Sequence, residues 1–193
     1  QTQFAPVGTE EETARAIREI PFPALLKART SGYDGKGQTR VATAQDLSAA
    51  HASLGGTPAV LEAMVPFARE ISVVLARTPD GTSRCFPVVE NEHRAGVLHM
   101  SRVPARLGER SANRAIEIAT TIADAIEHVG VMAVEMFAMH DGALLVNEIA
   151  PRVHNSGHYS LGACVTSQFE QHIRAICDLP LGSTELLRPA AMV

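Results

Sequence analysis

The sequence predicts an α+β protein in which helices accompany antiparallel sheets. Apolar, strand-like stretches run directly into turn sequences such as Pro79-Asp80-Gly81 and His140-Asp141-Gly142, which is typical of antiparallel hairpins. Residues 111–129 instead repeat apolar side chains at three- and four-residue steps, the spacing of one helix face. A chain of 193 residues is long enough for a sizeable core, and the change to longer apolar strands after residue 61 favours two lobes.

Composition and charge exclude several classes of function. The net charge is -4, so the chain lacks the excess of lysine and arginine that a nucleic-acid surface needs. No stretch approaches the roughly 18 apolar residues of a membrane helix, and the N-terminus lacks a signal-peptide pattern. Cys85, Cys164 and Cys177 have no CxxC spacing, so we predict neither a disulfide framework nor a zinc site. We therefore expect a cytoplasmic protein with neither a membrane nor a nucleic-acid partner.

We expect residues 1–61 to form the smaller lobe. Thr9 and Glu12 match a capping box, which predicts a helix that ends at Ile20 before Pro21. The rest of this lobe is predicted to contain a strand, a glycine-rich loop, a second strand, a helix and a third strand, at residues 24–29, 31–37, 38–42, 46–54 and 59–62.

Residues 62–193 are expected to form the larger lobe. The helix at 111–129 is predicted to lie between two hairpins, and a last helix precedes Leu179-Pro180. The hairpins pair residues 70–77 with 83–89 and residues 131–139 with 143–149, and the last helix covers residues 168–177. Because the chain begins at Gln1 without a methionine and stops in an apolar run, we expect it to be part of a longer protein.

Glu135 and Glu148 each stand alone in an otherwise apolar strand of the second hairpin. A buried carboxylate costs several kcal/mol unless a cation pairs with it. The short turn places both residues at the same end of the hairpin, opposite each other or nearly so, where two carboxylates repel unless a metal lies between them. Oxygen ligands with the amide of Asn147 beside them suit Mg²⁺. The alternative is a pair of ordinary edge-strand glutamates.

The loop at residues 31–37 holds three glycines, which let backbone amides approach an anion such as a phosphate. It has neither the spacing of a Walker loop nor the following helix of a dinucleotide-binding fingerprint. Lys27, alone in the preceding apolar strand, is a further candidate phosphate ligand. A plain glycine turn and a lysine that extends into solvent are the alternatives.

Together these residues resemble those of the ATP-grasp ligases, and among them the branch that carboxylates an aminoimidazole ribonucleotide in purine biosynthesis. The resemblance covers nearly the whole chain, and the run Ala150-Pro151-Arg152-Val153-His154-Asn155-Ser156-Gly157-His158 is its most specific part. It implies the ATP-grasp fold, in which two α+β lobes with antiparallel sheets clasp ATP between them. Residues 1–61 would be the small lobe, with the phosphate loop as its lid, and residues 62–193 the large lobe with the metal and substrate site. It also implies that an N-terminal domain and C-terminal residues of the family lie outside this sequence.

The resemblance assigns roles to residues by position. It implies ATP binding for Lys27, Gly32, Tyr33, Asp34, Gly35, Lys36, Gly37 and Gln38 at the phosphates, for Glu62, Ala63, Met64 and Val65 at the adenine, for Glu70 at the ribose, and for His93, Asn147 and Glu148. It implies magnesium binding for Glu135 and Glu148, catalysis for Arg152, His154 and Asn155, and substrate binding for Ser156 and His158. Arg152 would orient bicarbonate, because a guanidinium matches a planar anion with two hydrogen bonds. Taken alone, Arg152 also fits a core salt bridge and His93 a surface position.

The implied reaction is ATP-dependent carboxylation of 5-aminoimidazole ribonucleotide through carboxyphosphate. Bicarbonate is the implied co-substrate, Mg²⁺ the cofactor, and a homodimer the assembly of the full-length protein. A formate-dependent glycinamide ribonucleotide transformylase is the related alternative, although the run from Val153 to His158 favours the carboxylase. A nucleotide-binding fragment without turnover is the other alternative. Ser31 and Ala63 depart from the family pattern, at positions where neither change affects nucleotide binding.

Overall fold

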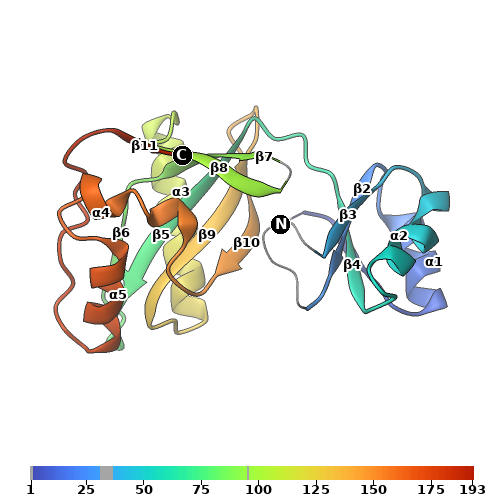
Figure 1. Ribbon diagram of the computed structural model, residues 1–193, viewed down its shortest axis with the longest axis horizontal. Coiled ribbons are helices and arrows are strands. Elements are labelled where there is room, and N and C mark those ends of the chain that lie inside the picture. Colours follow the sequence, from blue (N-terminus) through green and yellow to red (C-terminus); the bar gives the residue numbers. More distant parts are fainter. Residues whose placement is uncertain (1, 31–36, 95) are drawn as a thin grey trace. The chain divides into compact units, whose positions relative to one another are not determined.

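The computed structural model describes residues 2–30, 37–94 and 96–193, which fold into two compact units (Figure 1). The first unit comprises residues 1–66 with the short segment 95–97, and the second comprises Phe67–Arg94 and Leu98–Val193. The sequence predicts a boundary after residue 61, whereas the structure divides the chain after Pro66. The reason is that Glu62 and Ala63 still pair with neighbouring strands of the first unit.

A four-stranded antiparallel sheet forms the centre of the first unit, in the order β1-β4-β2-β3. Its strands are β1 (Phe4–Val7), β2 (Ala24–Ala28), β3 (Gln38–Val41) and β4 (Ala59–Ala63). The helices α1 (Glu10–Glu19) and α2 (Leu47–Ser53), the latter preceded by the 3₁₀ turn η1 (Ala44–Asp46), lie over one face of this sheet (Figure 1). In β2 the fully buried Ala24 and Leu26 alternate with the half-buried Leu25 and Lys27, so Lys27 lies on the face away from the core. The strand β1 was not predicted.

The predicted capping box is present at the start of α1, where Thr9 Oγ1 accepts from Glu12 N at 3.1 Å and Glu12 Oε2 accepts from Thr9 N at 3.3 Å. We expect Thr9→Ala to lower the free energy of unfolding by about 0.5–2 kcal/mol, because it leaves a helix N–H without its acceptor. Urea denaturation followed by circular dichroism measures this effect. Ser53→Ala at the end of α2 is the control, and an equal loss in both variants would contradict the capping role.

A seven-stranded sheet forms the second unit, in the order β10-β9-β5-β7-β8-β11 with β6 paired to β5. The strands are β5 (Arg69–Arg77), β6 (Ser83–Cys85), β7 (Val89–Arg94), β8 (Val97–Val103), β9 (Gly130–Ala138), β10 (Leu144–Ala150) and β11 (Ala190–Met192). Figure 1 shows α3 (Glu109–Ala125) on one face of the sheet and α4 (Ser160–Ala163) with α5 (Gln168–Ile176) on the other. A 3₁₀ turn, η2 (Asn155–Gly157), precedes α4. In the described residues, no helix is long and apolar enough to cross a membrane.

Two predicted elements of this unit differ from the structure. The predicted partner strand at residues 83–89 is divided into β6 and β7, which pair with different parts of β5. Pro87 lies between them and has no N–H to give to a sheet. The predicted helix at 111–129 ends at Ala125, and Ile126 and Val129 are exposed, because the chain turns there to enter β9. The second hairpin and the last helix are confirmed.

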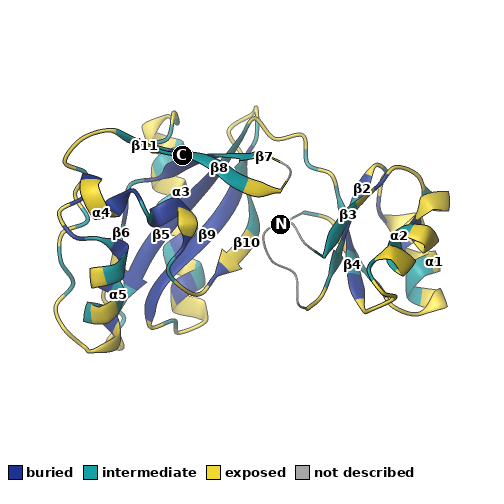
Figure 2. Ribbon diagram, in the orientation of Figure 1, coloured by how far each residue is buried: buried dark blue, intermediate teal, exposed yellow. Residues whose placement is uncertain are grey.

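The sheet separates two cores, and its central strands β5 and β9 are buried over most of their length (Figure 2). On one face, Ala115, Ala119 and Ala123 of α3 pack against buried residues of β5 and β9. On the other face, the buried side chains change from apolar to polar along each strand, since alternate residues share a face. On this face the apolar Val74 lies next to Ser72 in β5, Val89 next to Asn91 in β7, and Ala133 next to Glu135 in β9. This polar half of the face carries the candidate site.

Candidate functional site

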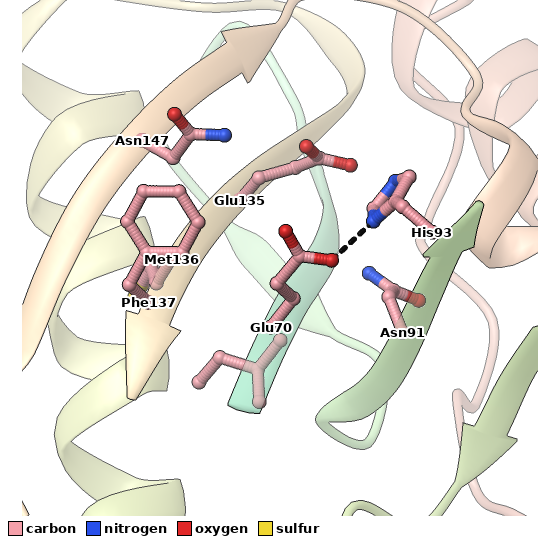
Figure 3. Close-up of a pocket in the computed structure, with 8 residues that line it drawn as sticks. Glu70, Asn91, His93, Glu135, Met136, Phe137 and Asn147 are labelled. Atoms are coloured by element: carbon pink, nitrogen blue, oxygen red, sulfur yellow. Dashed lines mark hydrogen bonds and ion pairs between the residues drawn. The ribbon is translucent and has the colours of Figure 1, made fainter. Parts of the chain in front are cut away.

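The predicted facing of the two glutamates is confirmed, because Glu148 of β10 lies directly opposite Glu135 of β9. The pairing shifts between Val146 and Glu148, which makes Asn147 the extra residue of a bulge. A bulge changes the direction of side chains, and Asn147 lines the same pocket as Glu135 (Figure 3). Glu135 is buried on an internal strand, so the edge-strand alternative fits only Glu148, which is exposed on the edge strand β10.

This group of oxygen ligands fits a magnesium ion. Mg²⁺ binds one or two protein carboxylates and takes its remaining ligands from water and phosphate oxygens. Glu135 and Glu148 provide two such carboxylates, and Asn147 places an amide beside them. Among the residues that the structure describes, no three His, Cys, Asp or Glu side chains form a metal cluster, so a complete protein cage such as a structural zinc site is not present there.

Glu70 and His93 form an ion pair in the same pocket (Figure 3). Each side chain is 24% exposed, so His93 does not occupy the surface position considered above. The hydrogen bond that His93 Nδ1 donates to the Glu70 carboxylate raises the pKa of His93 above its usual value, and the negative charges of Glu135 and Glu148 add to this effect. Three carboxylates therefore act on one imidazole, which makes this end of the sheet face attractive to cations. Glu70, predicted to bind ribose hydroxyls, is engaged with His93 in this structure.

The raised pKa of His93 predicts a pH-dependent contribution to stability. The pair with Glu70 favours protonated His93, so its contribution is complete below the unfolded pKa of about 6.5 and is lost as pH rises through the higher folded pKa. We expect the unfolding free energy of the native chain to fall over this range more than that of His93→Gln. Urea midpoints across pH and NMR titration of His93 measure it. A folded pKa at or below about 6.5 would contradict the prediction.

The predicted catalytic and substrate residues at 152–158 have different environments. Arg152 is exposed and donates to the carbonyl of Val153 at 2.9 Å, so the core salt bridge is not observed; Asn155 is also exposed. His154 is buried, with Nε2 3.5 Å from Glu135 Oε1. His158 stacks on Phe169, with ring centroids 5.4 Å apart.

Ser156 does not fit its predicted role in substrate binding. Its side chain is completely buried, and its hydroxyl lies between Ser72 Oγ at 2.8 Å and His154 Nδ1 at 2.9 Å. A buried hydroxyl with these two partners cannot contact a substrate directly. In the sequence, Ser156 lies in a run of polar residues, which does not show whether its side chain is buried. Its side chain is buried because η2 packs against β5.

Two buried glutamines hold the loops around this region, and sequence reasoning did not identify them. Gln168 donates from Nε2 to the carbonyl of His154 at 2.8 Å and accepts from His154 N at 3.0 Å. Gln171 makes the same pair of bonds with Gly182, at 2.7 and 3.0 Å. The available signal was their spacing, because residues three apart lie on one face of a helix and both amides occur on the buried face of α5.

The first unit carries the predicted ATP-phosphate and adenine residues. Lys27 Nζ lies 2.8 Å from Glu62 Oε2, so the candidate phosphate ligand pairs with a residue predicted for the adenine hinge. Gly37 has φ +79°, which favours glycine, and its carbonyl accepts from Ala28 N at 2.8 Å. Gln38 pairs with Lys27 across β3 and β2. Of the residues predicted at the adenine, Ala63 ends β4, Met64 is exposed and Val65 is half-buried. The remaining residues predicted at the phosphates lie outside the described residues: Gly32, Tyr33, Asp34, Gly35 and Lys36.

Known proteins match this chain over most of its length. The model of the ATP-grasp domain family matches residues 1–169. The chain is 47% identical over 190 residues to N5-carboxyaminoimidazole ribonucleotide synthase of Bacillus subtilis strain 168, covering 98% of this chain and 50% of that protein. It is 45% identical over 181 residues to the synthase of the same name from Brucella melitensis, covering 93% and 50%. The chain thus spans about half the length of the curated relatives it matches.

Solved structures agree with these sequence matches. An ADP complex of an N5-carboxyaminoimidazole ribonucleotide synthetase is similar with a TM-score of 0.94 and 48% identity, covering 100% of this chain and 51% of that one. The synthase of Aspergillus clavatus in complex with ADP and 5-aminoimidazole ribonucleotide is similar with a TM-score of 0.90 and 31% identity, covering 99% and 51%. With the family model matched over residues 1–169 and the same fold in these structures, the chain belongs to the ATP-grasp family.

Proposed function

We propose that this chain forms the ATP-grasp part of an N5-carboxyaminoimidazole ribonucleotide synthase. The reaction is the ATP- and bicarbonate-dependent carboxylation of 5-aminoimidazole ribonucleotide. The observation that carries the proposal is the facing pair Glu135 and Glu148, with Asn147 at the bulge beside them, in a chain whose relatives bear this name. Their oxygens fit Mg²⁺, which when bound would neutralise negative charge on the phosphate oxygens of ATP.

The chemistry requires activation of bicarbonate, whose delocalised charge makes its carbon a poor electrophile. Bicarbonate oxygen attacks the γ-phosphorus of ATP, the bond to the bridging oxygen breaks, and ADP and carboxyphosphate form. The exocyclic amine of the ribonucleotide then attacks the carboxyl carbon, phosphate leaves, and a proton is lost from nitrogen. Release of carbon dioxide from carboxyphosphate before this attack is the alternative order.

The chain's own residues support these steps by binding and orientation. Arg152 is exposed, so its guanidinium is accessible to a planar anion, and we assign it to bicarbonate. Lys27 is assigned to the ATP phosphates, where it would exchange Glu62 for phosphate oxygens. The exposed Asn155 is assigned to the reacting anions, and His158 to the ribonucleotide. His154 is buried behind Glu135, a position that supports an indirect role.

Release of ADP by the purified chain tests this function, with bicarbonate and 5-aminoimidazole ribonucleotide each added or omitted. Calorimetry with MgATP is run beside it. Turnover that requires both co-substrates is expected, whereas turnover with formate and glycinamide ribonucleotide instead would favour the transformylase. Failure to bind MgATP would contradict the proposal, provided that circular dichroism shows a folded chain.

A second candidate function is nucleotide binding without turnover. It is favoured by the coverage, because the chain aligns with only about half of each relative. Binding of MgATP with no ADP release under any co-substrate condition would support it. A homodimer and a cytoplasmic location also belong to the proposal for the full-length protein, and sedimentation and cell fractionation test them.

A further inference from the structure

A continuous line of hydrogen bonds crosses the second unit from β8 to η2. Ser101 Oγ donates to Asn91 Oδ1 at 2.9 Å, and Asn91 Nδ2 donates to Ser72 Oγ at 3.0 Å. Ser72 Oγ donates in turn to Ser156 Oγ at 2.8 Å, which lies 2.9 Å from His154 Nδ1. We call these five residues the polar chain. It joins three strands to the turn that carries His154.

Every member of the polar chain is buried, at 0–8% exposure. A buried hydroxyl or amide that loses its partner costs about 1–3 kcal/mol, so a set of five polar side chains is stable only when each is satisfied. Solvent does not reach Ser72 or Ser101, and direct contact with a substrate is therefore excluded for them. Any effect of these two residues on a ligand must therefore pass through the side chains that they contact.

The direction of the polar chain follows from its donors. The amide nitrogen of Asn91 can only donate, so Ser72 accepts from it and gives its own proton to Ser156. The Ser156 hydroxyl, which accepts from Ser72, can then donate its own proton to His154 Nδ1. The backbone N–H of Ser156 also donates to Nδ1, at 3.3 Å. A ring nitrogen that accepts an N–H bond carries no proton. In the neutral ring the proton is thus on Nε2, the atom 3.5 Å from Glu135 Oε1.

We propose that Ser72 and Ser156 are positioning residues, which hold His154 in the Nε2–H tautomer so that its proton faces the carboxylate of Glu135. Carboxylates that bind metals are commonly oriented by hydrogen-bonding groups behind them, and such groups change metal affinity by about 10–100-fold. The role of Glu135 in binding a cation rests on the proposed function. The tautomer of His154 does not, so the two can fail separately.

The experiment that tests this uses the native chain labelled with ¹⁵N at histidine, without nucleotide or metal. Long-range ¹H–¹⁵N spectra at alkaline pH report which ring nitrogen carries the proton, and His154→Gln identifies the signals. We expect an unprotonated Nδ1 and a protonated Nε2. In Ser72→Ala and Ser156→Ala we expect the two ring signals to move toward each other, as the tautomers mix. A proton on Nδ1 in the native chain would overturn the proposal without any variant.

Thr78→Ala is the matched control, because Thr78 is also buried and its hydroxyl donates to Asp80 and to the carbonyl of Thr82, away from the polar chain and from Gln168. It should leave the His154 signals in place, and Ser72→Thr, which keeps the hydroxyl, should restore them. Equal shifts in the control would reduce Ser72 to a structural role and overturn the proposal. Calorimetry adds a second measurement, in which Ser72→Ala weakens Mg²⁺-dependent ATP binding about tenfold. If no variant or native chain binds MgATP, the proposed function fails while the tautomer result stands.

Discussion

Replacing Glu135 with glutamine is expected to weaken Mg²⁺-dependent ATP binding, and any ADP release by the chain, by at least about 100-fold. Loss of a group behind a ligand already changes metal affinity by about 10–100-fold, and Glu135 is assigned as a ligand itself. Without metal the sign reverses, because a carboxylate repels phosphate and its removal leaves ATP affinity equal or higher. Calorimetry with ATP in excess Mg²⁺ and in EDTA measures both effects.

Stability separates this effect from damage to the fold. Two carboxylates directly opposite on paired strands repel, and glutamine keeps an oxygen that can accept from His154 Nε2, so Glu135→Gln should change the melting temperature little. Glu92→Gln on β7 is the control, because Glu92 pairs with Arg94 on the opposite face of the same sheet. Equal losses of MgATP affinity in the two variants would contradict the assignment of Glu135.

Replacing Gln168 with leucine is expected to lower the unfolding free energy by about 2–6 kcal/mol, because two buried backbone groups of His154 lose their partners at roughly 1–3 kcal/mol each. Gln171→Leu should have a similar cost, since Gln171 makes the same two bonds with Gly182. Only Gln168→Leu releases the backbone of His154. Urea unfolding and MgATP affinity, measured at low temperature on both variants, distinguish the two residues.

We expect Gln168→Leu and Gln171→Leu to lose similar unfolding free energy, and only Gln168→Leu to lose affinity for MgATP. If Gln171→Leu reduces MgATP affinity as much as Gln168→Leu, the effect comes from α5 as a whole and the specific support of His154 is refuted.

Local patterns were enough to predict the second hairpin and its two carboxylates. A short turn fixes the register of an antiparallel pair, so the sequence distance to the turn places Glu135 and Glu148 at the same end of the hairpin. Their direct facing depends also on the bulge at Asn147, because the register next to the turn would place Asn147 opposite Glu135. The capping box of α1 depends on residues three apart and is confirmed for the same reason. The strands β1, β8 and β11 were not predicted. β1 and β11 are short, and each pairs with a segment far away in the sequence, β4 and β8 respectively.

The sequence by itself determined the α+β class, the hairpin and the resemblance to ATP-grasp ligases, since all of these are expressed in neighbouring residues. Only the tertiary structure decided that Ser156 is buried, that Gln168 holds His154, and that Ser72 meets Ser156 across 84 positions of sequence. A polar residue in the chain looks the same whether it will face a substrate or support another side chain. The difference arises only when the sheet and its covering turn exclude water and leave each buried donor with one available acceptor.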